Sequence, residues 1–451
     1  MTLRNAVLAA LALSLAPAMA RADDVSIPFT TTKLSNGLTV ILHEDHALPI
    51  VTANIAYKVG SRFEEPKRTG LAHLFEHLMF MGTRRAPTKA FDAWMEAAGG
   101  WNDAETSEDH TDFYDVGPPT SLPLLLWLEA DRLRDLGPLM TQEKLDAQRA
   151  VVRNERRQTS ENVPYGKVEL VLPELLFPEG HPYHHPVIGS HEDLEAATVD
   201  DVKAFFHEWY DPANASLVVA GDFDPKATSA LIERYFGSIP THGPSRDPWD
   251  PSRAAAASLT KVVRQTVPDK VELPKILMAW QSPKHFAPGD AELDLVASVL
   301  ASGKASRLYR TLVYEKKLAQ SVEAEQTSGD LVSRFVVAAI ARPGVSLDKL
   351  EAAMDAEIAS VHGKAVLDEE LLRAQNGVIT GFVARLQSVR GRASLLNAYQ
   401  LDVGDAGYAQ KDLDRYTHAT KEGLLSVASR VLDPNARVIL RIVPEATKGA
   451  P

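Results

Sequence analysis

Residues 70–82 read Gly70-Leu-Ala-His-Leu-Phe-Glu-His-Leu-Met-Phe-Met-Gly82, and this stretch decides how the rest of the chain is interpreted. Its apolar residues recur at the spacing of a core helix that lies between the two glycines. Residues four apart share a helix face, so His73 and His77 would lie one turn from each other, with Glu76 beside them. Core packing does not require two imidazoles and a carboxylate so close together. We therefore predict that this helix binds a metal ion.

The order of the polar residues supports this prediction. His73-x-x-Glu76-His77 is the inverted form of the helix motif found in zinc proteases, in which the histidines bind Zn²⁺ and the glutamate moves protons. The alternative interpretation is that two half-buried histidines cap a core helix. We favour the zinc site because such a pentad is uncommon by chance in a chain of 451 residues.

A second helix, predicted over residues 141–159, offers a third ligand. Catalytic zinc usually has three protein ligands and one open position. Ala147, Val151 and Val152 indicate the buried face of this helix, and Glu155 shares that face. A glutamate there needs a partner, which a metal ion would supply.

Other partners and other ligands remain open for this position. A salt bridge could satisfy Glu155 instead of a metal, and three arginines are near in sequence: Arg153, Arg156 and Arg157. Glu161 and Glu169 are the local alternatives as the third ligand. The residue pattern alone does not separate these possibilities.

Taken together, these residues resemble the pitrilysin-like (insulinase-type, M16) zinc metallopeptidases. The matching residues are His73-x-x-Glu76-His77, Glu155 within Val151-Val-Arg-Asn-Glu-Arg-Arg, the run from Gly99 to Tyr114, and His181-Pro-Tyr through Gly189. The chain length resembles the short bacterial subfamily related to the mitochondrial processing peptidases. The resemblance implies His73, His77 and Glu155 as ligands of one zinc ion per chain and Glu76 as the general base.

The same resemblance implies a function and a substrate-binding strand. Members are endopeptidases that enclose short or unfolded peptides and cut them with a zinc-activated water. Trp101–Thr106 resembles the family's edge strand, to which an extended peptide would add by backbone pairing. We therefore expect substrate binding by Asn102, Asp103, Ala104, Glu105 and Thr106. The family usually has asparagine before the alanine, where this chain has Asp103, so side-chain contacts could differ there.

The resemblance also implies an α+β fold of two similar α/β domains that face each other as a clamshell. Each domain would contain a mixed or antiparallel sheet flanked by helices. The sequence agrees, because both halves close with a helix, Asp-Pro, a short turn and an apolar strand, at residues 209–221 and 430–443. The stretch Leu295–Val299 then corresponds to the metal-binding pentad and carries no ligand.

One feature of single-chain members is missing from the second half. They carry an arginine and, seven residues later, a tyrosine that reach the substrate. The matching positions here are Val313 and Gln320, and Arg310 or Tyr314 could substitute only with a register shift. We expect a related subunit to supply the pair in a heterodimer, with a homodimer or a weakly active monomer as alternatives. A non-catalytic zinc-binding or peptide-binding protein, or a scaffold subunit, is the alternative function.

Composition and length set the remaining expectations. A net charge of −12 argues against nucleic acid as a partner, and no cysteine is present for disulfides. These values exclude only those two possibilities.

Residues 1–22 are typical of a cleaved signal peptide, and an uncleaved anchor is the alternative. No later segment is apolar enough to span a bilayer. We expect secretion across the inner membrane into the periplasm. The predicted domains are residues 23–240 (zinc-binding) and 263–451 (inactive), with 241–262 as a linker.

Overall fold

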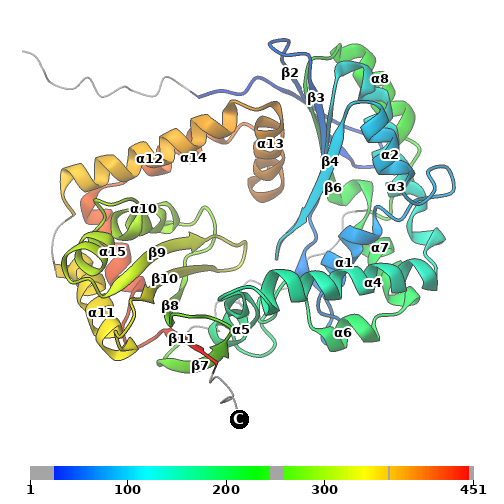
Figure 1. Cartoon of the computed structure of the whole chain (residues 1–451). Coiled ribbons are helices and arrows are strands. Elements are labelled where there is room, and N and C mark those ends of the chain that lie inside the picture. Colours follow the sequence, from blue (N-terminus) through cyan, green and yellow to red (C-terminus); the bar gives the residue numbers. More distant parts are fainter. Residues whose placement is uncertain (1–24, 244–258, 364–365, 446–451) are drawn as a thin grey trace, which may run out of the picture.

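The computed structural model describes residues 25–243, 259–363 and 366–445, so the predicted signal peptide at 1–22 lies outside it. Two sheets, each flanked by helices, form two halves that face each other (Figure 1). This arrangement confirms the predicted fold class.

The first sheet has six strands in the order β1-β2-β6-β3-β5-β4. In it β2 and β6 run parallel, and the other neighbouring pairs are antiparallel. Its strands are β1 (Thr30–Lys33), β2 (Thr39–Glu44), β3 (Val51–Tyr57), β4 (Trp101–Thr106), β5 (Thr111–Gly117) and β6 (Ala215–Gly221). As predicted, Trp101–Thr106 forms a strand at the edge of its sheet.

The second sheet repeats this plan with five strands in the order β7-β11-β8-β10-β9. Here β7 and β11 are parallel and the other neighbours are antiparallel, so order and direction match β2-β6-β3-β5-β4 one for one. The strands are β7 (Val263–Asp269), β8 (Lys275–Ser282), β9 (Ala319–Thr327), β10 (Ser333–Ala341) and β11 (Val438–Pro444). The predicted similarity of the two halves is therefore present in the strand topology.

Helices cover both sheets. Those of the first half are α1 (Leu71–Leu78), α2 (Ala90–Ala97), α3 (Leu122–Asp135), α4 (Gln142–Arg156), α5 (Lys167–Leu176), α6 (His191–Ala196), α7 (Val199–Trp209) and α8 (Pro225–Phe236). Those of the second half are α10 (Asp290–Ala301), α11 (Leu347–Gly363), α12 (Asp368–Leu386), α13 (Val389–Val403), α14 (Ala409–Thr417) and α15 (Lys421–Val431). By position in the repeat, α10 is the counterpart of α1.

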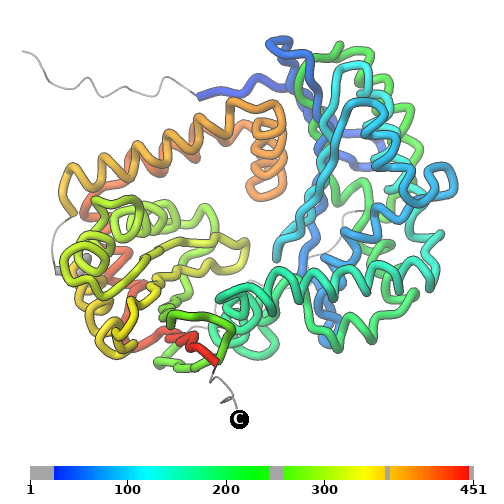
Figure 2. Tube along the Cα trace, viewed as in Figure 1, coloured from blue at the N-terminus to red at the C-terminus, as the bar shows by residue number. Residues whose placement is uncertain are grey.

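Two of these helices pack against the sheet of the opposite half. Val168, Leu172 and Leu176 of α5 join a core with strands of the second sheet, whereas Leu395 and Leu396 of α13 join a core with strands of the first. Figures 1 and 2 show α13 beside the first sheet, away from most of its own half. Each half therefore keeps a core of its own, and two further clusters join the halves. The domain boundary expected at residues 241–262 stays a prediction.

Candidate metal centre

The helix that carries the two histidines is fixed at its start by local geometry. Gly70 has a φ of +86°, and a Cβ there would lie 2.7 Å from the carbonyl oxygen of Ile188. The buried carboxylate of Glu64 accepts hydrogen bonds from the N–H groups of Gly70 (2.9 Å) and Ala72 (2.7 Å). These contacts satisfy donors that an α-helix leaves free at its N-terminus. The apolar residues of α1 are buried in the core, so the helix position is fixed on that side too.

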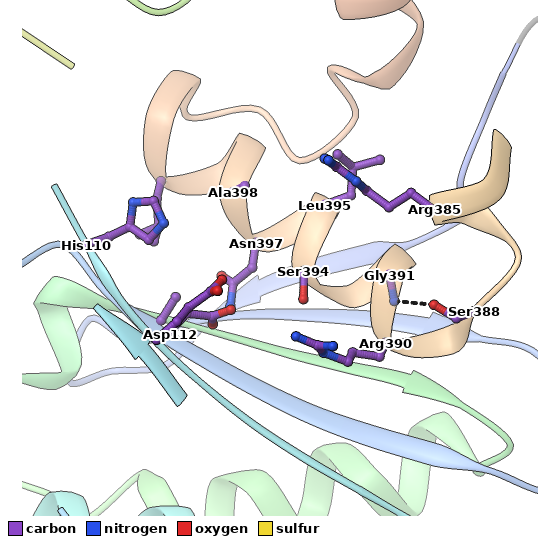
Figure 3. Close-up of a pocket in the computed structure, with 13 residues that line it drawn as sticks. His110, Asp112, Arg385, Ser388, Arg390, Gly391, Ser394, Leu395, Asn397 and Ala398 are labelled. Atoms are coloured by element: carbon purple, nitrogen blue, oxygen red, sulfur yellow. Dashed lines mark hydrogen bonds between the residues drawn. The ribbon is translucent and has the colours of Figure 1, made fainter. Parts of the chain in front are cut away.

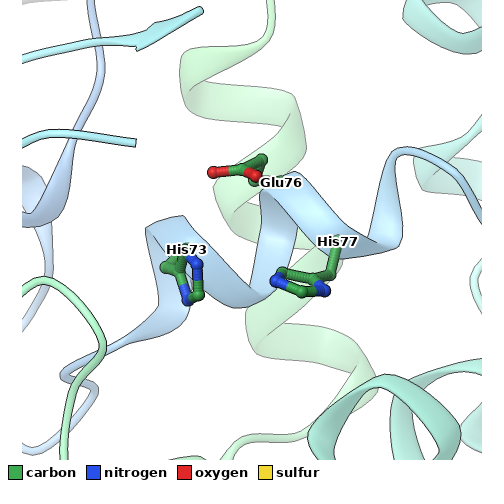
Figure 4. Close-up of side chains that lie close together, drawn as sticks. All are labelled: His73, Glu76 and His77. Atoms are coloured by element: carbon green, nitrogen blue, oxygen red, sulfur yellow. The ribbon is translucent and has the colours of Figure 1, made fainter. Parts of the chain in front are cut away.

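His73 and His77 lie on one face of α1, as the spacing predicts (Figure 4). Their ring centroids are 4.8 Å apart. Glu155 approaches from α4, with its Oε1 3.6 Å from His73 Nε2 and its Oε2 3.1 Å from His77 Nε2. The structure therefore brings the three predicted ligands together.

The other carboxylates near Glu155 in sequence have different partners. Glu161 lies 2.9 Å from both Arg156 Nε and His191 Nε2. The side chain of Glu169 is 64% exposed and lies near Arg334. Arg153 contacts Glu195. Neither alternative ligand is thus oriented toward the two histidines.

The expected buried face of α4 is partly wrong. Val152 is fully buried, but Val151 is 47% exposed and Ala147 is also exposed. Successive residues lie about 100° apart on a helix, so two adjacent valines cannot both lie at the centre of its buried stripe. The stripe runs through Leu145 and Val152, and Glu155 lies one turn beyond Val152.

Glu76 is close to the histidines but is held by a different contact. Its carboxylate is almost fully buried, and Oε2 accepts a hydrogen bond of 2.5 Å from Thr106 Oγ1. Thr106 is the last residue of β4, so this bond links the metal helix to the edge strand. The side-chain contact of Thr106 was not predicted, because it depends on how β4 packs against α1.

The protonation of the cluster suits metal binding. Burial lowers the pKa of His73 to about 4, so this imidazole is neutral at pH 7. Burial also lowers the pKa of His77, but the hydrogen bond to Glu155 and the charges of Glu76 and Glu155 outweigh it and raise that pKa. The hydrogen bond from His77 lowers the pKa of Glu155. A cation bound here would replace the proton shared by His77 and Glu155.

The donor set fits zinc in both chemistry and spacing. Two imidazoles and one carboxylate form a common ligand set of catalytic zinc. Donor atoms bound tetrahedrally to one zinc at about 2.0–2.1 Å lie about 3.3 Å apart. The Nε2-to-carboxylate distances of 3.1 and 3.6 Å bracket this value. Within the described ranges, the histidine and carboxylate group whose ligand atoms all lie within 4.8 Å of one another is His73, Glu76 and His77. Glu155 meets the two imidazoles through different oxygens, Oε1 for His73 and Oε2 for His77.

The open edge of β4 presents specific backbone groups. Ser107 N–H donates to His110 O at 2.9 Å, which fixes a hydrogen-bonded pair at the hairpin end. Hydrogen-bonded pairs alternate along an antiparallel ladder, so Asn102, Ala104 and Thr106 direct their backbone groups away from β5. The Ala104 N–H indeed bonds to the side chain of Asp103, at 2.9 Å, and not to β5. An added strand would therefore pair with these three residues.

The positions of the second half that correspond to the metal-binding pentad carry no metal ligand, and those that correspond to the arginine and tyrosine pair carry neither residue. Leu295 and Val299 of α10 are buried apolar residues of the second core. Val313 is buried, and Gln320 is exposed at the start of β9. Tyr314 is 74% exposed, and Arg310 lies 3.4 Å from Glu315.

Comparison with known families agrees with this two-part organisation. Residues 39–178 match the family model described as "Insulinase (Peptidase family M16)". Residues 196–378 match the model described as "Peptidase M16 inactive domain". The chain belongs to peptidase family M16, which the resemblance of its motifs predicted.

Individual relatives carry names of the same kind. The chain is 28% identical over 389 residues to "Zinc protease PqqE" of Helicobacter pylori, covering 84% of this chain and 86% of that protein. It is 25% identical over 316 residues to "Probable mitochondrial-processing peptidase subunit beta" of Schizosaccharomyces pombe, covering 66% of each. A crystal structure of a protease from Helicobacter pylori superposes with a TM-score of 0.85 at 23% identity, covering 93% of this chain and all of that one. This last likeness supports the fold.

Within the described part of the chain, no helix combines the length and the apolar character needed to cross a membrane.

Proposed function

We propose that this chain is a zinc-dependent metalloendopeptidase that hydrolyses short or unfolded peptides. The observation that carries the proposal is the convergence of His73, His77 and Glu155, with Nε2-to-carboxylate distances of 3.1 and 3.6 Å. Glu76 lies on the same helix, and its carboxylate accepts a hydrogen bond from Thr106. Membership of a family whose named relatives are zinc proteases supports the same conclusion.

Each residue then has a defined part in the reaction. His73, His77 and Glu155 would hold one zinc ion, which would supply a Lewis acid able to lower the pKa of a bound water and polarise the scissile carbonyl. Glu76 would accept a proton from the attacking water and donate it to the leaving amine. Burial raises the pKa of Glu76 although the Thr106 hydrogen bond opposes this, so its affinity for a proton is increased. Thr106 also fixes the orientation of the carboxylate.

Backbone pairing along β4 explains why extended peptides would be the substrates. Asn102, Ala104 and Thr106 direct their backbone groups away from β5, and an added strand would pair with them whatever its side chains, replacing the bond of the Ala104 N–H to Asp103. Asp103 and Glu105 alternate with them and can contact side chains of the peptide. A folded protein cannot present such a strand unless it opens locally.

The variant Glu76→Gln tests the reaction. We expect it to bind zinc like the wild type and to lose at least about 1,000-fold in kcat, because the proton acceptor is gone. The matched control is Glu143→Gln, an exposed change on α4 that should leave both zinc content and rate unchanged. Wild-type rates in the zinc-loaded Glu76→Gln protein would refute the proposed role.

We further propose that a related subunit completes the site. The arginine and tyrosine expected of single-chain members are absent at Val313 and Gln320, and the exposed Arg310 and Tyr314 are out of register. Peptide cleavage should therefore rise at least about tenfold when an M16 chain that lacks the zinc motif is added. Full activity of the monomer would rule the partner out, and activity that follows self-association would indicate a homodimer.

A zinc-binding or peptide-binding protein without turnover, or a scaffold subunit, is the second candidate. The missing arginine and tyrosine favour it. It would be preferred if the wild type binds zinc and peptide but cleaves nothing with any partner. We also propose that the mature chain acts in the periplasm, which N-terminal sequencing and fractionation of the expressed protein would test.

A further inference from the structure

A cavity of about 420 Å³ lies between the edge of the first sheet and the helices that cross over from the second half. Its charged and polar lining includes Glu105, His110 and Asp112 from the strand side and Arg385, Arg390 and Ser394 from the helix side. Figure 3 shows Arg390 and Ser394 pointing from α13 toward the strands. The cavity is separate from the metal helix, and no step of the proposed reaction uses it.

The two faces of β4 point to different environments. Thr106 bonds to Glu76, Ala104 packs against the core of the first half, and Asn102 bonds to Asp92 of α2. Side chains alternate along a strand, so Asp103 and Glu105 face the opposite side, where the cavity lies. Every second side chain of a peptide added to β4 would face that side too.

Arg390 is held at one end of this face without a counter-ion. Its guanidinium lies 3.7 Å from the ring centroid of Tyr114 and 5.9 Å from that of Trp101. Its Nε is buried and has no hydrogen-bond partner. In the part of the chain that the structure describes, neither Arg390 nor Arg385 forms an ion pair. Two guanidinium groups therefore remain available to an incoming anion.

Among the described residues, no nearby carboxylate forms an ion pair with either arginine, and Asp112 carries no compensating charge. Burial raises the pKa of Asp112 to about 8, so it is neutral at pH 7. Asp103 accepts hydrogen bonds from Tyr114 Oη and from the Ala104 N–H. Glu105 is the remaining carboxylate of the lining and is exposed. Burial lowers the pKa of His110, which leaves it uncharged.

We propose that this cavity is a subsite for an acidic side chain of the bound peptide, and that Arg390 and Arg385 recognise its carboxylate. The inference rests on the proposed pairing of peptide substrates with β4. Arg390 contacts Trp101 and Tyr114, and Tyr114 pairs with Asp103, so the arginine lies near positions 101–103 of β4. The other end of β4 lies at the metal helix, where Thr106 bonds to Glu76. The preferred Asp or Glu is therefore three to five residues from the scissile bond, about 10–17 Å along the strand.

Binding of peptides to the zinc-loaded Glu76→Gln protein tests this subsite without requiring turnover. The probes are fluorescein-labelled extended peptides in which one position carries Glu, Gln or Lys. That position is placed in turn three, four and five residues from the scissile bond. At the position whose side chain enters the cavity, we expect the Glu peptide to bind at least about fivefold more tightly than the Gln peptide. The Lys peptide should bind more weakly than either. Equal affinities at every scanned position would overturn the proposal, as would no binding of any peptide.

Variants of Arg390 test whether the cavity causes the preference for Glu peptides. Arg390→Gln should remove most of the preference for Glu over Gln, and Arg390→Glu should favour the Lys peptide. The matched control is Arg234→Gln, which removes the same charge from the exposed side of α8. A Glu preference that persists unchanged in both Arg390→Gln and Arg385→Gln would overturn the subsite.

Cleavage assays keep this inference distinct from the proposed function. Wild-type protein that cleaves the Glu and Gln peptides with equal kcat/KM would overturn the subsite and leave the peptidase intact. A Glu preference in binding, together with no cleavage under any partner condition, would overturn the peptidase and support the subsite.

Discussion

At the scale of single residues, Glu155 is the most informative side chain. It is partly exposed, yet its carboxylate contacts both histidines and no arginine within the described ranges. Glu161, six residues further along, bonds to Arg156 and His191 instead. Two neighbouring glutamates of the same chemistry therefore have different expected effects on metal binding.

The variant Glu155→Gln should weaken zinc binding by more than about 100-fold, because an anionic ligand becomes a neutral amide. Competition titration against a chelating dye would measure the change. Glu161→Gln serves as the control, and its zinc affinity should stay within about threefold of the wild type. Equal losses in the two variants would contradict the assignment of the third ligand.

A second residue, Asp112, predicts how stability depends on pH. It is 6% exposed, and burial raises its pKa from 3.8 to about 8. Between these values the folded protein keeps the proton and the unfolded chain releases it, so folding takes up a proton. The free energy of unfolding therefore falls as the pH rises through this window, by at most about 1.4 kcal/mol per pH unit.

Asp112→Asn removes this titration and keeps an acceptor for the Asn54 side chain. The variant should become more stable relative to the wild type as the pH rises from 5 to 8. Thermal unfolding of both proteins across that range would measure the difference. A constant or shrinking difference in Tm would show that Asp112 does not retain its proton.

The sequence predicts the ligand residues and misses the residues that support them. His73, Glu76 and His77 are recognisable because one helix places them together, and Glu155 follows from the resemblance. Glu64, which caps α1, and Arg390, which faces β4 from the other half, have no sequence pattern of their own. Their contacts arise only when distant segments pack. The roles of the ligand residues stay predictions until they are tested.

At the scale of elements, β4 connects the metal helix to substrate binding. It is an edge strand, and the alternation of its hydrogen bonds leaves the Ala104 N–H outside the ladder with β5. Sequence alone could indicate a strand here. Which backbone groups remain free depends on the register with β5, and hence on the hairpin at Ser107 and His110.

Ala104→Pro should reduce peptide affinity at least about tenfold and leave zinc binding intact. Proline removes a donor that the ladder does not use, and edge strands tolerate it. Ala104→Ser keeps the N–H and is the matched control. Fluorescence anisotropy with an extended peptide would measure both variants. Unchanged affinity in a folded Ala104→Pro protein would argue against pairing at this edge.

At the scale of the whole molecule, the two halves resemble each other, and each has its own core, but two further apolar clusters join them. Leu395 and Leu396 of α13 cover Ile41 and Val218 of the first sheet, while α5 covers the second. The buried Asn397 also donates to the backbone of Asn54 and Ser216. Hydrophobic patterns indicate that α5 and α13 have buried faces, but not which sheet they cover. The crossover was therefore not predicted.

Separate expression of residues 25–243 and 259–445 tests this arrangement. Each half alone would expose the apolar sheet face that the other half normally covers, so we expect aggregation or loss of cooperative unfolding. The two pieces expressed together should copurify as one complex. Cooperative thermal unfolding of either isolated piece would show that the clusters between the halves are not needed for folding.

The position of the metal tests the central claim most directly. Anomalous diffraction at the zinc edge, from crystals of the zinc-loaded protein, would locate the ion without reference to activity. The account predicts one zinc per chain, bound by Nε2 of His73 and His77 and by the carboxylate of Glu155. Zinc found at another position, or bound by Glu76 in place of Glu155, would contradict it.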